Sequence, residues 1–274
     1  MADKKDLSGL KVLNAVFFVL MVAVNALANF FPLNGKTTGE VSQQYTNLFT
    51  PPPFTFLIWG LIYLMLAGFV LFQFGAFRGN DSTYREDLIQ EIGPYFAISS
   101  IANAAWIFAW HYGMIGVSVV LILILLYSLS VIVFEISKYD LLPMREKILV
   151  KYPFSVYFGW VTVAVIANIA AFLVSIGWEG FGWPQQVWTV ILLVIGLVIT
   201  AFVTLKNRDI AYGLVVIWAY SGILYRHLSK TGYDGQYSGV IWTLILSLIV
   251  LVGIVVFLYL SKKKEAPDLR QARK

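Results

Sequence analysis

The sequence predicts an all-α membrane protein, a polytopic bundle of about eight transmembrane helices. Two observations support this fold class. Hydrophobic residues make up 59% of the 274 residues and charged residues only 13%, about half the charged share of a soluble domain. The apolar residues also gather in runs of about 20, the length that a helix needs to cross roughly 30 Å of hydrocarbon. Helices are expected because a helix pairs its backbone polar groups within itself.

Eight apolar runs account for the expected helices: 12–31, 54–75, 92–112, 114–137, 153–176, 186–205, 210–228 and 240–260. The second run follows three prolines, Pro51, Pro52 and Pro53. Proline suits the first turn of a helix, because it has no N–H group to leave unpaired there. The short gaps at Gly113 and at 207–209 predict tight helical hairpins.

The first run has two interpretations. It follows Lys4 and Lys5 and ends in Ala-Leu-Ala, a pattern typical of a cleaved signal peptide. However, Asn14, Asn25 and Asn29 fall on one helical face at 100° per residue. Such a face is useful in a bundle, where asparagine bonds across helices, so we expect the first helix to be retained.

Lysine and arginine are distributed unequally between the two ends of the predicted bundle. With an even number of spans, all but three of the 20 fall at the end that holds both termini, and the exceptions are Lys36, Arg226 and Lys230. The positive-inside rule then predicts cytoplasmic termini in a multi-pass protein of the cell membrane. The net charge of +5 therefore belongs beside anionic lipid, and nucleic acid is not an expected partner.

Residues suited to catalysis are few. The chain has no cysteine, which excludes disulfides and cysteine-bound metals. His111 and His227 lie near outer helix ends and are interpreted as interfacial polar residues, with a joint metal or haem site as the alternative. Glu135 lies inside the fourth run, where an acid is a functional candidate, but Lys138 one turn later favours an ion pair over proton coupling. We predict no catalytic residues and no metal site.

Aromatic residues form a stripe on each of three predicted helices. Their steps of three, four or eight residues place each stripe on one helical face. Such faces either pack helices together through small residues and asparagines, or line a pocket for a flat, apolar ligand. On the second interpretation, the binding residues are Phe56, Trp59 and Tyr63, then Asn103, Trp106 and Trp110, then Tyr157, Trp160 and Asn168.

Three further tryptophans, Trp178, Trp183 and Trp188, flank a short outer loop. We interpret them as part of an aromatic belt at the level of the lipid headgroups.

Three segments resemble the TspO/MBR family of tryptophan-rich sensory proteins, which is related to the mitochondrial translocator protein. They are FTFLIWGLIY at 54–63, NAAW at 103–106 and WVTVAVIAN at 160–168. The family carries Phe, Trp and Tyr on its second helix, Asn and Trp on its third, and Trp, Ala and Asn on its fifth. The resemblance covers about residues 10–177. It implies a five-helix bundle that binds porphyrins and other flat, apolar ligands.

On this basis we expect a TspO/MBR-like bundle at 1–177, three additional transmembrane helices at 178–261 and a basic cytoplasmic tail at 262–274. The expected partners are the lipid bilayer and a small apolar ligand, with a homodimer as a further candidate. No cofactor is predicted beyond a porphyrin or haem-like ligand. The segment 33–50 has Tyr45 and Phe49 but lacks the tryptophan that the family often supplies from this loop, which argues against porphyrin breakdown as an enzymatic activity.

The function expected from these features is sensing or transport of a tetrapyrrole-like molecule, with porphyrin breakdown as the one enzymatic alternative. The alternative is a permease or scaffold subunit of a larger transport complex, suggested by the three extra helices and the basic tail.

Overall fold

The computed structural model describes residues 7–77, 86–139 and 142–271, and for 262–271 it describes the backbone alone. Every regular element within these ranges is helical, as predicted. In chain order the elements are α1 (Ser8–Phe30), η1 (Leu33–Gly35), α2 (Thr38–Gln44), η2 (Pro53–Leu57), α3 (Ile58–Gln73), α4 (Glu86–His111), α5 (Ile115–Ser137), α6 (Met144–Glu146), η3 (Lys147–Lys151), α7 (Tyr152–Ser175), η4 (Gly180–Gly182), α8 (Gln185–Lys206), α9 (Ile210–Leu228) and α10 (Ser238–Gln271).

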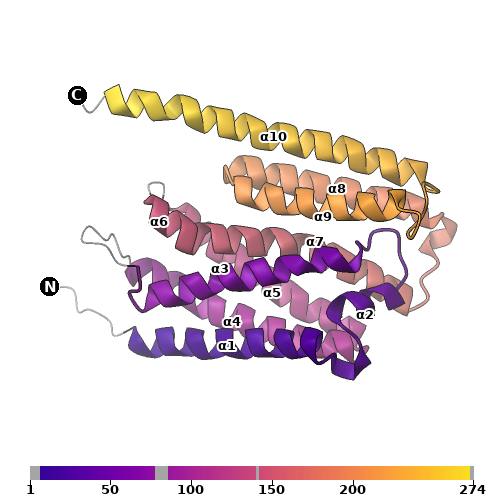
Figure 1. Ribbon diagram of the computed structural model, residues 1–274, viewed down its shortest axis with the longest axis horizontal. Coiled ribbons are helices and arrows are strands. Elements are labelled where there is room, and N and C mark those ends of the chain that lie inside the picture. The colour runs from indigo at the N-terminus through magenta and orange to yellow at the C-terminus, as the bar shows by residue number, and fades with distance from the viewer. Residues whose placement is uncertain (1–6, 78–85, 140–141, 272–274) are drawn as a thin grey trace.

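Seven helices in the described part of the chain are long and apolar enough to cross a membrane. The eighth predicted span, α9, has the expected bounds but does not reach that hydropathy, because Arg226 and His227 lie in its last turn. It nevertheless runs alongside α8 and α10 (Figure 1). The chain is therefore a multi-pass membrane protein.

Some helices extend beyond their predicted bounds. α4 begins at Glu86 rather than at residue 92, with Glu86 and Asp87 in its first turn, where acidic side chains are favoured by the helix dipole. The fifth predicted span is preceded by α6 and by η3, which is a turn of π-helix. α10 remains helical through Gln271, so the predicted tail is largely a continuation of that helix, and residues 272–274 lie outside the described part.

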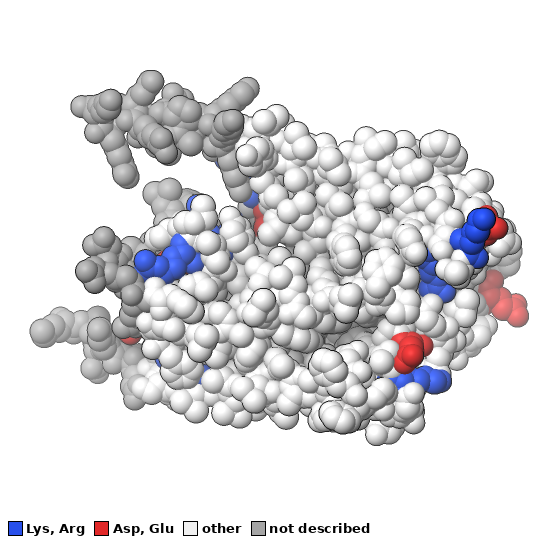
Figure 2. All heavy atoms as spheres, in the orientation of Figure 1, with Lys and Arg blue, Asp and Glu red and all other residues white. Residues whose placement is uncertain are grey.

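The helices form two groups (Figure 1). One contains α1, α3, α4, α5 and α7, and the other contains α8, α9 and α10, which contact the first group mainly through α7. α1 begins and α10 ends at the same end of the bundle. Figure 2 shows charged side chains at the two ends of the visible face and none across its middle, as expected for a surface that faces lipid.

The first helix is packed into the bundle by its asparagines, as predicted. Asn14 donates a hydrogen bond to Gln73 of α3 (2.8 Å), and Asn25 donates one to Asn103 of α4 (2.7 Å). Asn29 instead bonds to the backbone of Asn25 within α1.

The two helix groups approach closely where α7 crosses α9. A Cβ atom on Gly159 would lie 2.9 Å from the carbonyl oxygen of Tyr212, so only glycine allows this approach. Nearby, the hydroxyl of Ser155 donates to the buried carboxylate of Asp209, which also caps the N-terminus of α9. This junction holds α9 against the helix that lines the candidate site.

Candidate functional site

The three predicted aromatic stripes converge at the centre of the first helix group. Trp59 of α3 stacks on Tyr63, with ring centroids 5.6 Å apart. It meets Trp160 and Tyr157 of α7 edge to face at 6.1 Å and 5.8 Å, and Trp106 of α4 at 6.3 Å. These separations are those of attractive aromatic pairs, so the rings contact one another.

The two predicted asparagines join helices within this cluster. Asn103 accepts a hydrogen bond from Asn25 and donates one to the hydroxyl of Tyr157 (2.9 Å). Asn168 accepts from the indole Nε1 of Trp106 (2.7 Å). Polar groups of both amides therefore bond to other helices, which is the packing role that the sequence left open.

A narrow cavity of about 40 Å³, here called the central cavity, lies beside the cluster. Six of the nine predicted site residues line it, whereas Tyr63, Asn103 and Tyr157 do not. The remaining lining residues come from α7, from α2 and from the loop before α3. Those outside α7 were missed because nothing in the sequence indicates where the segment before α3 folds. The complete lining is Ser42, Thr50, Pro51, Phe56, Trp59, Trp106, Trp110, Trp160, Val163, Ala164, Ala167, Asn168 and Ala171.

Two indole groups on the wall of the central cavity have unused hydrogen-bond donors. Trp59 and Trp160 are 7% and 3% exposed, and neither Nε1–H has a partner in the described part of the chain. Most buried polar groups are paired, and an unpaired one costs about 1–3 kcal/mol. Both residues line the central cavity, and both retain an unused donor.

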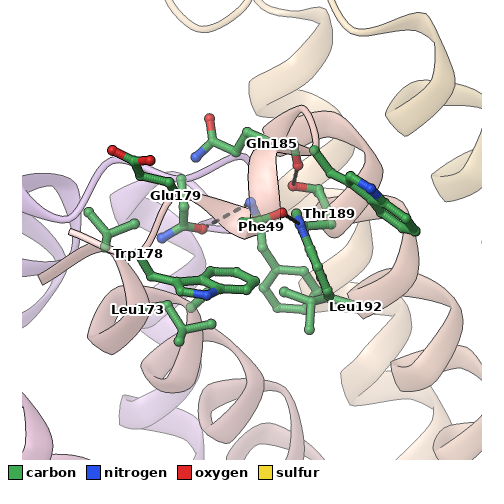
Figure 3. A pocket seen from close by; sticks show the side chains of 13 residues that line it. Phe49, Leu173, Trp178, Glu179, Gln185, Thr189 and Leu192 are labelled. Atoms are coloured by element: carbon green, nitrogen blue, oxygen red, sulfur yellow. Dashed lines mark hydrogen bonds between the residues drawn. The ribbon is translucent and has the colours of Figure 1, made fainter. Parts of the chain in front are cut away.

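A larger cavity of about 330 Å³ lies between α7 and α8, and it is here called the α7–α8 cavity (Figure 3). Its lining includes Trp178, Trp183 and Trp188, which were interpreted only as a headgroup belt. Trp178 and Trp188 meet at 4.9 Å. Figure 3 shows Phe49, Trp178, Leu173 and Leu192 on one side of the cavity and Glu179 and Gln185 on the other. The sequence does not reveal this cavity, because Phe49 reaches it from a distant loop.

The segment 47–51, here called the dividing segment, separates the two cavities. Asn47 and Phe49 line the α7–α8 cavity, whereas Thr50 and Pro51 line the central cavity. All five residues of the segment except Leu48 thus contribute to one wall or the other, and Leu48 is itself buried.

The second helix group holds the dividing segment in place. Tyrosine is protonated at neutral pH, and burial raises the pKa of Tyr233 further. Three side chains of α9 and the loop that follows donate to backbone oxygens of the segment: Tyr233 to Asn47 (3.2 Å), His227 to Leu48 (2.9 Å) and Arg226 to Thr50 (3.0 Å). The helices absent from the five-helix resemblance thus fix a wall shared by both cavities.

The histidines and Glu135 have structural partners. His111 bonds to the carbonyl oxygen of Leu33 (3.0 Å), and His227 bonds to Leu48 as described above. Glu135 forms the predicted ion pair with Lys138. Within the described residues, no group of three or more His, Asp or Glu side chains could hold a metal ion.

Comparison with known proteins supports one family. A family model described as TSPO-like protein matches residues 11–265, a range that runs from α1 into α10. No curated protein and no solved structure matches the chain.

Proposed function

Since the chain belongs to the TSPO-like family, we propose that this membrane protein binds a flat, apolar, tetrapyrrole-like molecule at the central cavity for sensing or transport. The observation that supports this most directly is the pair of unpartnered indole donors on Trp59 and Trp160, both on the wall of a cavity otherwise lined by rings and small residues.

The chemistry of the wall matches such a ligand. Indole faces stack on flat conjugated rings. Ala164, Ala167 and Ala171 have small side chains, so they leave room for a ligand on the α7 side of the cavity. The two Nε1–H groups would donate to acceptor atoms at the ligand's edge, such as carboxylate or carbonyl oxygens. The asparagines hold the indole walls in position, as the bond from Trp106 to Asn168 illustrates.

Size sets a condition on binding. Sites for drug-sized molecules measure roughly 300–1,000 Å³, far more than the 40 Å³ of the central cavity. A ligand of tetrapyrrole size therefore requires the dividing segment to move and so to widen the central cavity. The bonds from Arg226, His227 and Tyr233 oppose that movement.

A titration with protoporphyrin, followed by tryptophan fluorescence in purified protein, tests the proposal. We expect saturable quenching. The double variant Trp59→Phe/Trp160→Phe keeps an aromatic ring at both positions but removes both donors, and it should weaken binding about tenfold or more, because each hydrogen bond contributes about 1 kcal/mol. Trp242→Phe is the matched control, because Trp242 lies on α10 and is 63% exposed.

Two results would contradict the proposal: quenching that does not saturate, or a double variant that binds like the control. Uptake of the same porphyrin into proteoliposomes then separates transport from sensing, because only transport accumulates ligand inside the vesicle.

A further inference from the structure

We infer that the α7–α8 cavity is a second binding site, separate from the central cavity, for an organic cation with an apolar body. This inference does not depend on the proposed function, because it concerns different side chains and a different ligand chemistry. Three observations support it: the volume of the cavity, its indole lining and the charge at its mouth.

The volume suits a small molecule. At about 330 Å³, the cavity falls within the range of roughly 300–1,000 Å³ that small-molecule sites occupy. Its floor is apolar, with Phe49, Leu173 and Leu192 around the Trp178 ring (Figure 3). An apolar or aromatic body of a ligand can be buried against these groups without leaving a polar atom unpaired.

The indoles supply the attraction for a cation. Trp178, Trp183 and Trp188 all line the cavity, and indole is the aromatic side chain that attracts cations most strongly through its ring face. The Nε1–H of Trp188 is already bonded to the carbonyl oxygen of Gly180 (2.9 Å). Trp188 therefore offers the cavity its ring surface rather than a donor.

The turn that carries these groups has an unusual backbone. Gly177, Gly180, Phe181 and Gly182 all have positive φ angles, and Phe181 is a residue that rarely adopts one. This conformation places Trp178 and Glu179 at the cavity together. Strained backbone of this kind is concentrated at functional sites.

The fixed charge at the mouth is negative. Glu179 lines the cavity and no lysine or arginine does, and within the described residues no ion pair involves its carboxylate. The C-terminus of α7 and the N-terminus of α8 both border the cavity, so their opposite helix dipoles offset each other. Glu179 therefore sets the sign of the electrostatic potential at the mouth, and its negative charge favours a cation.

Isothermal titration calorimetry of the purified full-length protein with phenyltrimethylammonium tests the inference. We expect saturable binding, with at least tenfold weaker binding of tert-butylbenzene, which has the same shape but no charge. Glu179→Gln should weaken binding of the cation tenfold or more and leave that of tert-butylbenzene unchanged. Glu40→Gln, a substitution of another exposed carboxylate, should leave both unchanged.

Repeating the titration in lipid nanodiscs shows whether the natural cation is a lipid headgroup or a free molecule. Weaker apparent binding in phosphatidylcholine than in phosphatidylethanolamine discs, whose lipids also carry no net charge, identifies the choline headgroup as competitor, whereas equal binding identifies a free organic cation. Equal binding of the charged and uncharged probes would overturn the inference, as would equal effects of the Glu179 and Glu40 substitutions. Porphyrin quenching measured on Glu179→Gln stays at its normal value if the two sites are separate.

Discussion

The central cavity and the α7–α8 cavity share the helix α7 and the dividing segment, yet they differ sharply in form. Around the central cavity, tryptophans repeat at helical spacing on long helices, and their rings pack against one another. Around the other, tryptophans lie on a glycine-rich turn and at the start of α8, and a space of about 330 Å³ remains between them. Residue type is the same in both places, so the backbone that carries the rings decides whether they close or leave room.

The largest expected difference between the two regions is in the free energy of unfolding that is lost when a tryptophan is removed. Trp160→Ala deletes a ring that is 3% exposed and should lower the free energy of unfolding by about 3–5 kcal/mol, as large aromatic truncations in packed cores do. Trp188→Ala removes a half-buried ring beside open space and should cost about 1 kcal/mol. Denaturant unfolding in detergent measures both, and equal losses would contradict the distinction between the two regions.

The bond that His227 donates to the dividing segment should affect both cavities. His227→Ala leaves the buried carbonyl of Leu48 without its partner and should cost about 1–3 kcal/mol. Hydrogen exchange should also quicken at residues 48–50. Lys230→Ala, an exposed substitution on the adjacent loop, serves as control. Unchanged exchange in the His227 variant would show that the segment holds its position without this bond.

A substitution at Gly180 should act on the α7–α8 cavity alone. Its φ angle is +65°, and a Cβ atom there would lie 2.8 Å from Nε1 of Trp188. Gly180→Ala should therefore cost about 1–2 kcal/mol, the penalty of a left-handed conformation with a side chain, and weaken phenyltrimethylammonium binding. Porphyrin quenching is the internal control, because a change there would mean that the two cavities are coupled through α7.

The smallest effect is expected when the pH is lowered, and it concerns α2, which lies beside the central cavity. The backbone N–H of Thr37 donates to the Glu40 carboxylate and, with the Thr37 hydroxyl, holds the pKa of Glu40 below its ordinary value. The stability from this capping box is present above the ordinary pKa of about 4.3 and is lost as pH falls through the lower, folded-state pKa. The protection factors of the α2 amides, which relate the intrinsic exchange rate at each pH to the observed rate, should therefore fall in acid in the native protein, whereas Glu40→Gln should show no such dependence.

The sequence predicted the helices well because hydrophobic length is a local property. The bounds of α9 were predicted to the residue, and the three stripes do meet. The loop 33–52 was beyond prediction, since its place depends on bonds to residues far along the chain. The roles of Asn103 and Asn168 were equally hidden, because a partner on another helix depends on how both helices are rotated. The place of Trp178 and Trp188 on a cavity wall stayed hidden for a related reason: a belt and a cavity wall use the same residue types.

The hydrogen bonds that hold the dividing segment can form only after most of the chain has been synthesised. His227 and Leu48 are 179 positions apart in the chain, and Tyr233 and Asn47 are 186 apart. A ribosome therefore completes α1 to α8 before it makes the side chains that secure the shared wall. Contacts so distant in sequence form late, because the intervening chain must first be ordered. The five helices of the core are thus made before the dividing segment can be secured, and the loop between α9 and α10 must be made before all of these bonds can form.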